Sequence, residues 1–327
     1  MARGADWNGR SSRAGACIEV GNAVIMAVKS YVKRLLGLPA LPAMRVDLAV
    51  LERDWVFQPS RANPLALTRR FRATSRCGEA PDSRILKPLY PRSRWIAYFI
   101  YLPTGGLTAA HRYTLERLRG ARDAGLLVVC ATAASIPPPA ELHGIADALY
   151  WKDLGGFDFS AYALAIAETA RLSPGADLLV QNDSVFGPFC PVDDLWPRMK
   201  WDLTGFTASG AVENHIQSYA FCLKSVDASK VEALRAIFPP GRAYQDYEAV
   251  LLRQETRMAS VAALSMSVGA LWYAPPDDCA DASLFAALPL VDAGFPFLKR
   301  GLLTKHAGIY PRDAVIEVLR KLGHPTP

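Results

Sequence analysis

The chain has 327 residues, of which 51% are hydrophobic and 21% are charged, so it is long enough to bury a sizeable globular core. Its apolar runs are too short to cross a bilayer, and the charged start of the chain lacks the apolar segment of a secretory signal. Scattered cysteines without a Cys-x-x-Cys pair exclude a zinc ribbon, and they predict a cytoplasmic protein.

Basic residues are concentrated in the N-terminal part of the chain. Residues 1–94 hold 17 Lys and Arg against 7 Asp and Glu, so the remaining residues must carry −4 for the net charge to be +6. Because the body is acidic and has no recognition motif, we expect no binding to nucleic acid. A basic N-terminal arm that contacts an anionic surface fits this distribution better.

Residues 1–94 are expected to form this arm, and residues 95–327 the main domain. Within the arm, residues 22–38 have apolar side chains at helical spacing with lysines and arginines beside them. Such a helix either lies on an anionic membrane or packs on the body, and the pattern does not decide between these alternatives. Residues 39–94 are rich in proline and arginine and are expected to be extended and irregular.

After residue 94 the pattern changes to alternating strands and helices. Apolar runs predict strands at 95–101, 126–131, 146–151 and 178–181, and amphipathic spacing predicts helices at 108–124 and 159–172. Gly125 is expected to end the first of these helices. Further along, we expect a strand over 216–223 and helices over 228–237 and 244–258. The alternation predicts an α/β fold with a mainly parallel sheet and flanking helices.

The most informative motif is the polar group Asn182-Asp183-Ser184, which follows the strand expected at 178–181. Ligands of open α/β sheets bind at the carboxyl ends of the strands. A carboxylate beside amide and hydroxyl oxygens suits a hard divalent cation that is also bound to phosphate, so Asp183 is the candidate metal ligand. The alternative is an Asx-turn in which Asn182 or Asp183 binds the backbone.

Two further clusters flank this motif in the sequence. Gly155 and Gly156 would let a ligand approach the backbone closely, and Asp158 either binds that ligand or caps the helix that follows. His215, Gln217 and Tyr219 would share one face of a strand and line a cleft. His215 is a candidate base, although a single histidine can also be a structural group.

The last cluster lies at the start of the helix expected over 244–258. Asp246 and Glu248 are candidate general bases there, and the alternative is that they stabilise the helix N-terminus. Dinucleotide-binding, P-loop and nucleophile-elbow motifs are not found in the sequence.

In their order these clusters resemble the rhamnan synthesis protein F family of bacterial polysaccharide-assembly proteins. The matching segments are Gly156-Phe157-Asp158-Phe159, Asn182 to Pro188, Thr204 to Thr207, His215-Ile216-Gln217-Ser218-Tyr219, Tyr247-Glu248 and Phe295 to Lys299. The resemblance covers about 95–303, and Thr204 stands where the family usually has tryptophan. Residues 1–94 lie outside it.

The resemblance implies a GT-A-like glycosyltransferase that moves a sugar from a nucleotide-sugar donor to a cell-surface polysaccharide or lipid-linked glycan. It implies Mn²⁺ or Mg²⁺ as cofactor, held by Asp183, and substrate-binding roles for the matched residues Asn182, Ser184, Ser218 and Lys299. It also implies a place in the cytoplasm or at the inner membrane face. The alternative function is a non-catalytic glycan- or assembly-binding protein that keeps the fold.

Overall fold

The structure, a computed structural model, describes residues 47–62, 64–276 and 281–326. The chain divides into two compact units, Met1–Met44 and Arg45–Pro327, and every described residue belongs to the second unit. The amphipathic segment expected over 22–38 therefore lies outside the described residues. In the described ranges no helix is long and apolar enough to cross a membrane.

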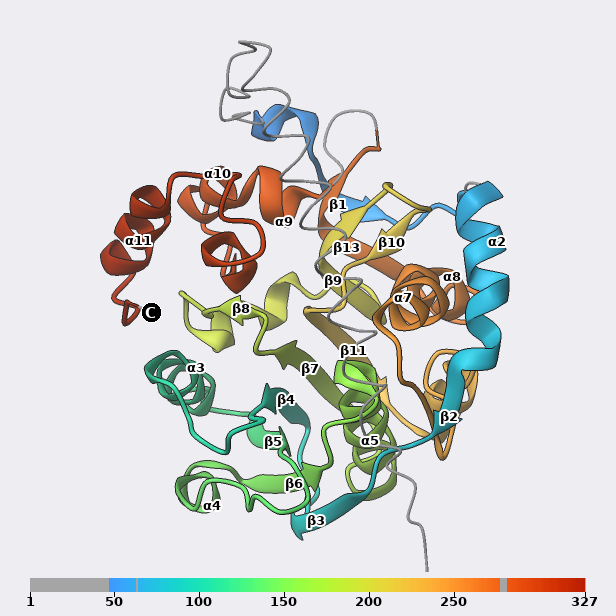
Figure 1. The fold of residues 1–327 in the computed structure, drawn as a ribbon, viewed down its shortest axis with the longest axis vertical. Coiled ribbons are helices and arrows are strands. Elements are labelled where there is room, and N and C mark those ends of the chain that lie inside the picture. The colour runs from blue at the N-terminus through green and yellow to red at the C-terminus, as the bar shows by residue number, and fades with distance from the viewer. Residues whose placement is uncertain (1–46, 63, 277–280, 327) are drawn as a thin grey trace, which may run out of the picture. The chain divides into compact units, whose positions relative to one another are not determined.

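A ten-stranded mixed sheet forms the centre of this unit (Figure 1). Its strands are β1 (Glu52–Val56), β3 (Ser83–Lys87), β4 (Arg94–Tyr101), β5 (Gly125–Ala131), β6 (Ala148–Lys152), β7 (Ala176–Asn182), β9 (Leu203–Ser209), β10 (His215–Ile216), β11 (Ala220–Val226) and β13 (Val268–Ala274). They lie in the order β1-β13-β9-β11-β7-β4-β5-β6-β3, and β10 pairs with β9.

Most strands of this sheet run in one direction. Parallel pairing joins β7, β4, β5 and β6, and also β9 and β13, while β11 lies antiparallel between β7 and β9. The edge strands β1 and β3 are antiparallel to their neighbours. This mostly parallel mixed sheet with flanking helices is the α/β class that was expected.

Helices and two small sheets complete the described unit. The helices are α2 (Pro64–Ala73), α3 (Ala109–Arg119), α4 (Glu141–Ile145), α5 (Phe157–Leu172), α6 (Ala228–Ala233), α7 (Tyr247–Val250), α8 (Thr256–Ala262), α9 (Ala282–Phe285), α10 (Ala287–Asp292) and α11 (Arg312–Lys321), with a π-helical turn at Leu251–Glu255. The 3-10 turns are Leu48–Val50, Thr74–Arg76, Val192–Asp194, Trp196–Arg198 and Arg300–Leu303. The small sheets pair β2 (Cys77–Glu79) with β12 (Arg242–Tyr244), and β8 (Val185–Phe186) with β14 (Leu298–Lys299).

The central strands were predictable because both of their faces are buried. Alternate residues of β4 enter two separate cores, with Trp95 and Phe99 in one and Ile96 and Tyr98 in the other. The first core is covered by α5 and α8, and the second by α3, α4 and α10. A strand buried on both faces is apolar throughout, which is the pattern that the sequence displays.

The prediction of an irregular arm up to residue 94 needs correction. Residues 52–87 form β1, α2, β2 and β3, and β1 and β3 are the two edges of the main sheet. Most β1 and β3 side chains are exposed, so neither strand produces an apolar run that would identify it. The compact unit begins at Arg45, well before the expected boundary.

Several other boundaries also differ from the prediction. The strand expected over 216–223 is interrupted at 217–219, and the helix expected over 244–258 is divided by the π-helical turn. The helix expected over 228–237 ends at Ala233. Gly125 does not cap α3 but begins β5, where a Cβ atom would lie 2.5 Å from the Trp95 ring.

Candidate active site

A cleft of about 550 Å³ lies at the carboxyl ends of β7 and β9. Its walls are formed by the turn after β7, the loop between β9 and β11, the π-helical turn 251–255, and the segment 299–306. Because β7 and β9 run in the same direction, their polar carboxyl ends meet at one edge of the sheet. The predicted site residues that line the cleft are Asp158, Asn182, Asp183, Ser184, His215, Gln217, Ser218, Tyr219 and Lys299.

Asp183 follows β7 directly and connects the cleft with the neighbouring strand. Its Oδ2 accepts a hydrogen bond from the backbone N–H of Tyr101 at 3.0 Å and lies 3.5 Å from His111 Nε2. The His111 Nδ1 accepts the N–H of Thr108, and its Nε2 lies between Asp183 and Arg300 Nη1, the latter at 3.1 Å. The Asp183 side chain is 17% exposed, which leaves it accessible to a ligand.

Asn182 forms the Asx-turn that was the alternative interpretation of this motif. Its Oδ1 accepts hydrogen bonds from the Ser184 backbone N–H at 3.0 Å and from Ser184 Oγ at 2.6 Å. The Asn182 Nδ2 then points the other way and donates to Asp158 Oδ2 at 2.8 Å. The turn is therefore made by Asn182, while the carboxylate of Asp183 binds the end of β4.

Positively charged side chains face these carboxylates across the cleft. Lys299, Arg300 and Lys305 all line it. Arg300 Nη1 donates to the Asp183 carbonyl oxygen at 2.9 Å, and Lys299 Nζ lies 4.2 Å from the centre of the Tyr219 ring. Lysine and arginine groups of this kind bind phosphate oxygens through charge-assisted hydrogen bonds.

Asp158 was expected as the N-cap of α5, but Gly156 occupies that position and Asp158 lies two residues later, in the first turn of the helix. Burial, reinforced by the negative charge of Glu255, raises the pKa of Asp158 to about 6. Hydrogen bonds to its Oδ2 from Asn182 and from the Tyr162 hydroxyl, the latter at 3.2 Å, oppose that shift. Asp158 thus titrates much closer to neutral pH than an exposed aspartate does.

Glu255 brings a further carboxylate to the cleft, and the sequence pattern did not single it out. It ends the π-helical turn and its Oε1 accepts the backbone N–H of Ser218 at 3.1 Å. Single π-helical turns inside helices occur frequently at functional sites. Ser218 therefore acts through its backbone, which positions the Glu255 carboxylate.

His215, Gln217 and Tyr219 all line the cleft, although only His215 belongs to a strand. Thr207 Oγ1 holds the other two side chains, at 2.6 Å from Gln217 Oε1 and 2.7 Å from the Tyr219 hydroxyl. His215 Nδ1 lies 2.7 Å from the Glu213 carbonyl oxygen and must donate to it. The neutral ring therefore presents the lone pair of Nε2 as a proton acceptor.

The remaining predicted residues lie outside the cleft lining. Asp246 caps α7 and pairs with Arg76, and Glu248 pairs with Arg69 and Arg76. These contacts place both carboxylates against basic residues of α2 and of the 3-10 turn that follows it.

Gly155 and Gly156 contact protein groups of the α5 N-terminus. The Gly155 carbonyl accepts Lys152 Nζ at 2.7 Å, and the Gly156 N–H donates to Gln245 Oε1 at 2.9 Å. Gly156 has φ +74°, and a Cβ atom there would approach Ser160 and Ala243 within 3 Å, so packing requires glycine.

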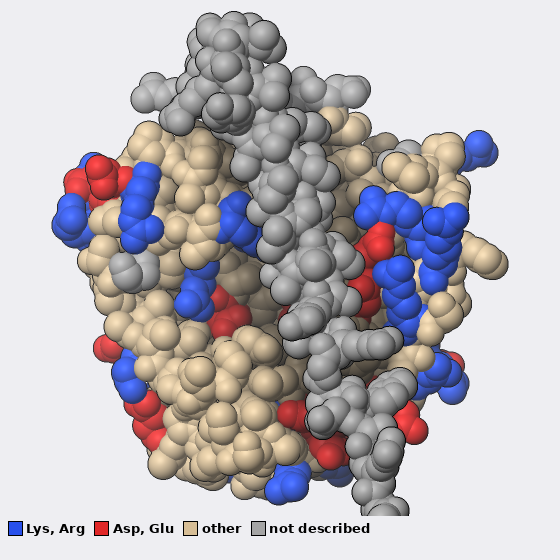
Figure 2. All heavy atoms as spheres, in the orientation of Figure 1, with Lys and Arg blue, Asp and Glu red and all other residues tan. Residues whose placement is uncertain are grey.

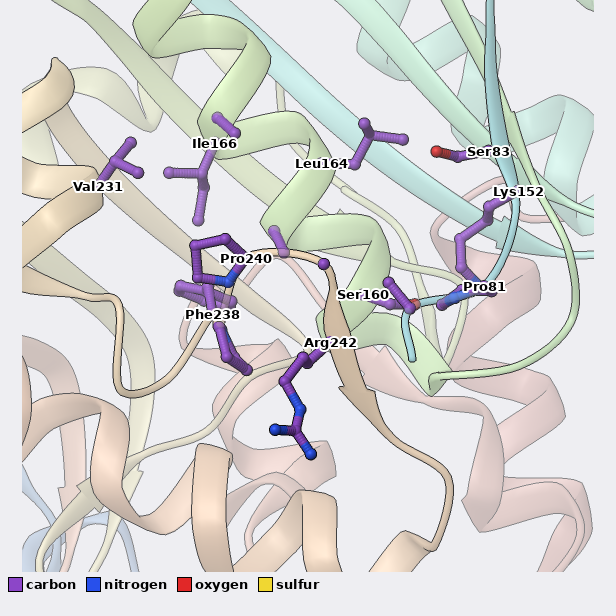
Figure 3. Close-up of a pocket in the computed structure, with 15 residues that line it drawn as sticks. Pro81, Ser83, Lys152, Ser160, Leu164, Ile166, Val231, Phe238, Pro240 and Arg242 are labelled. Atoms are coloured by element: carbon purple, nitrogen blue, oxygen red, sulfur yellow. The ribbon is translucent and has the colours of Figure 1, made fainter. Parts of the chain in front are cut away.

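A second cavity, of about 330 Å³, lies on the other side of α5 (Figure 3). Its walls are mainly apolar, with Leu164, Ile166 and Phe238 among them. Lys152 lies at one end, but its ammonium group is bound to the carbonyl oxygens of Asp153 and Gly155. Because the walls of this cavity are mainly apolar, whereas carboxylate, amide, imidazole and basic groups converge in the cleft, the cleft is the better candidate site.

A divalent cation bound in the cleft would have Asp183 as its protein ligand. In the ranges that the structure describes, no group of three or more His, Cys, Asp or Glu side chains could hold a metal ion. Magnesium sites often use one or two carboxylates and take their other ligands from water and substrate phosphates. Asp183 fits that smaller requirement, with a nucleotide diphosphate supplying oxygen ligands.

The cleft residues that the sequence did not reveal have weak local signals. Glu255 lies in the middle of an expected helix. His111, which contacts Asp183 from outside the cleft lining, lies in the first turn of α3. Arg300 and Lys305 follow the matched Lys299 and could have been included on that basis. The contacts of these residues join segments that are distant in the sequence, as in the bond from Arg300 to Asp183, which are 117 residues apart.

Comparison with known proteins gives distant structural similarities. No protein-family model and no curated protein matches the chain. Among solved structures, S. aureus TarS is 11% identical with a TM-score of 0.34, and the match covers 70% of this chain and 42% of TarS. A 4-diphosphocytidyl-2C-methyl-D-erythritol synthase from Anaerococcus prevotii is 10% identical with a TM-score of 0.34, over 62% of this chain and 96% of that one.

A mannosyltransferase from Pyrobaculum calidifontis, solved with GDP-Man and Mn²⁺, is 14% identical with a TM-score of 0.26, over 79% of this chain and 80% of that one. The present chain thus matches less than half the length of TarS. Similarities this distant assign no activity, so the functional argument rests on the residues of the cleft.

Proposed function

We propose that this protein is a glycosyltransferase that uses a nucleotide-sugar donor. The observation that carries the proposal is the cleft itself, where the carboxylate of Asp183 at the end of β7 lies among Lys299, Arg300 and Lys305. A nucleotide diphosphate needs both cationic side chains for its phosphates and polar groups for its sugar. Other polar groups of the same cleft, including Gln217 and Ser184, would bind sugar hydroxyls.

In the proposed reaction, the bond from the anomeric carbon to the diphosphate oxygen breaks and the acceptor hydroxyl oxygen bonds to that carbon. The nucleoside diphosphate leaves with its electron pair, and the acceptor proton passes to a base of the protein. Lys299, Arg300 and Lys305 would stabilise the negative charge of the departing diphosphate. Such preorganised charges are commonly among the largest contributions to catalysis.

His215 and Glu255 are the strongest candidates for the base because both line the cleft. The Nδ1–H of His215 is bound to a carbonyl oxygen, so its Nε2 can accept a proton. Asp246 and Glu248 were also predicted as candidate bases from the sequence. Both form ion pairs with arginine residues and lie outside the cleft lining. A base role for either would require the release of these ion pairs.

Mn²⁺ or Mg²⁺ is proposed as cofactor, with Asp183 as its protein ligand. When bound, the ion would neutralise charge on the diphosphate. The acceptor is proposed from the family resemblance as a cell-surface polysaccharide or lipid-linked glycan of the rhamnan, O-antigen or capsule type. The protein would then act in the cytoplasm or at the inner membrane face, with residues 22–38 as a possible contact with lipid.

Calorimetry with UDP, GDP and dTDP, each with and without Mn²⁺, tests this proposal. We expect one nucleotide to bind more tightly with Mn²⁺, and Asp183→Asn to weaken that binding at least tenfold through the lost ligand charge. Asp193→Asn is the matched control, because Asp193 has a similarly accessible side chain but pairs with Arg122 outside the cleft.

Two results would count against the proposal. If no nucleotide binds to a protein that unfolds cooperatively, the non-catalytic glycan-binding alternative is favoured. If nucleotide binds equally well with and without Mn²⁺ and with Asp183→Asn, the cleft remains a nucleotide site but Asp183 is not a metal ligand.

A further inference from the structure

Helix α2 exposes an apolar face that the fold leaves in solvent. Leu67 is 50% exposed and Phe71 is 82% exposed. Leu65 is 66% exposed but lies about 160° away from Leu67 around the helix axis, so it is not part of this face. Leu67 and Phe71 are four positions apart and therefore adjacent on the helix surface. Large apolar side chains exposed together mark a surface that binds a partner.

The opposite face of α2 fixes this orientation. Ala66 and Ala73 are buried, and Arg70 points inward to bind the Leu252 carbonyl at 2.8 Å, Thr256 Oγ1 at 3.1 Å and the Glu213 carboxylate. The helix is therefore held by the protein before any partner arrives. Leu67 and Phe71 cannot turn inward without breaking these contacts.

The charges around α2 indicate the partner. Between Pro64 and Arg76 the chain holds Arg69, Arg70, Arg72 and Arg76 and no acidic residue. Figure 2 shows Lys and Arg side chains gathered on the side of the molecule where Figure 1 places α2. The neighbouring Arg253 and Arg70 together lower the pKa of Arg257, whose burial is the larger cause, so positive charge is in excess here.

We propose that α2 is a docking surface for an anionic lipid bilayer. Phe71 and Leu67 would enter the boundary between headgroups and acyl chains, while Arg72 would contact lipid phosphates. Arg69 and Arg76 are paired with Glu248 and Asp246 and would lie beside this contact. Helices that lie in a membrane interface combine an apolar face with arginines and lysines in this way. The surface is distinct from residues 22–38 and does not depend on the proposed chemistry. Since α2 contacts the π-helical turn that ends in Glu255, docking would hold that wall of the cleft near the bilayer.

Flotation of the full-length protein with vesicles tests this surface. We expect the protein to float with vesicles of phosphatidylcholine and phosphatidylglycerol, and to float much less with phosphatidylcholine alone. The double variant Leu67→Ser/Phe71→Ser should reduce the partition coefficient at least about tenfold, because two apolar side chains no longer enter the membrane. Arg72→Gln should reduce it about fivefold, the value of one basic residue near an anionic surface.

Leu264→Ser is the matched control, since Leu264 is 85% exposed but follows α8 instead of lying on α2. It should float like the parent protein. The proposal is overturned if the double variant floats like the parent, if the parent does not float, or if neutral vesicles bind equally well. Nucleotide binding by the double variant should be unchanged, so failure of this proposal is distinguishable from failure of the proposed function.

Discussion

At the scale of single residues, Asp158 shows how the cleft sets the charge of a carboxyl group. The Tyr162 hydroxyl lies 3.2 Å from Asp158 Oδ2 and 3.0 Å from the Ser218 carbonyl oxygen. One hydroxyl proton cannot serve both acceptors, but a protonated Asp158 can donate to Tyr162, which then donates to Ser218. Burial and the charge of Glu255 raise the pKa of Asp158 although the bonds from Tyr162 and Asn182 oppose the shift, and the neutral form can keep its hydrogen-bond partners.

We therefore expect Asp158→Asn to stabilise the protein at neutral pH. The pKa of Asp158 is about 6 in the folded state, above the ordinary value of 3.8, so folding favours the protonated form. Stability contributed by this group falls as pH rises from about 4 to about 6 and stays low above that range. Asparagine is neutral at every pH and avoids the loss.

Thermal unfolding of both proteins at pH 4.5 and at pH 7.5 would measure this effect. The melting temperature of Asp158→Asn should exceed that of the parent by a few degrees, roughly, at the higher pH, and the difference should shrink at the lower pH. A variant that is less stable than the parent at pH 7.5 would show that the charged form of Asp158 is favoured instead.

At the scale of elements, Arg70 connects α2 with two walls of the cleft. Its guanidinium group binds the Leu252 carbonyl within the π-helical turn and the carboxylate of Glu213, whose own carbonyl oxygen fixes the His215 ring. The ion pair is largely buried, with side-chain exposures of 12% and 10%. Arg70 is therefore a positioning residue for Glu255 and His215, and it belongs to a segment that the sequence analysis placed outside the main domain.

Replacing Arg70 should be costly because a buried carboxylate would lose its partner. We expect Arg70→Met to reduce the free energy of unfolding by about 3–5 kcal/mol. Arg69→Met is the matched control, since the adjacent Arg69 pairs with Glu248 at the surface and should cost less than about 1 kcal/mol. Urea unfolding of the two variants measures this difference. An equal reduction in the free energy of unfolding for both variants would mean that the Arg70 ion pair contributes no more than a surface ion pair.

The elements that were predicted correctly are those whose local pattern reflects their burial. β4, β5 and β7 are buried on both faces and have apolar residues along their central stretches, and α5 has its apolar residues at helical spacing. β1 and β3 lie at sheet edges with most side chains in solvent, so their sequences resemble loops. The π-helical turn inside the expected helix 244–258 follows from tertiary contacts such as that of Arg70, which leave no pattern in the sequence.

At the scale of the whole molecule, the sheet order explains how the site is assembled. β7 occupies the centre of the sheet, beside β4 on one side and β11 on the other. The turn after β7 can therefore contact Tyr101 at the end of β4, and the loop before β11 contributes His215 and Tyr219. The sequence indicated these polar clusters one by one, but their meeting depends on strand pairing between distant segments, which no local motif encodes.

The same topology predicts where the chain can be shortened. β1 pairs with β13 and β3 pairs with β6, so residues 52–87 supply both edges of the main sheet. All of these strands lie in the unit Arg45–Pro327. A chain that starts at Arg45 should keep a cooperative thermal transition within a few degrees, roughly, of the full-length protein.

A chain that starts at Arg94 should lose that transition or melt far lower. It would expose the paired edges of β13 and β6 and would leave the buried Glu213 without Arg70. Calorimetry and circular dichroism of the two shortened chains make the comparison. If the chain that starts at Arg94 melts like the full-length protein, residues 52–87 are dispensable for folding, and the main domain begins near Trp95 as the sequence alone suggested.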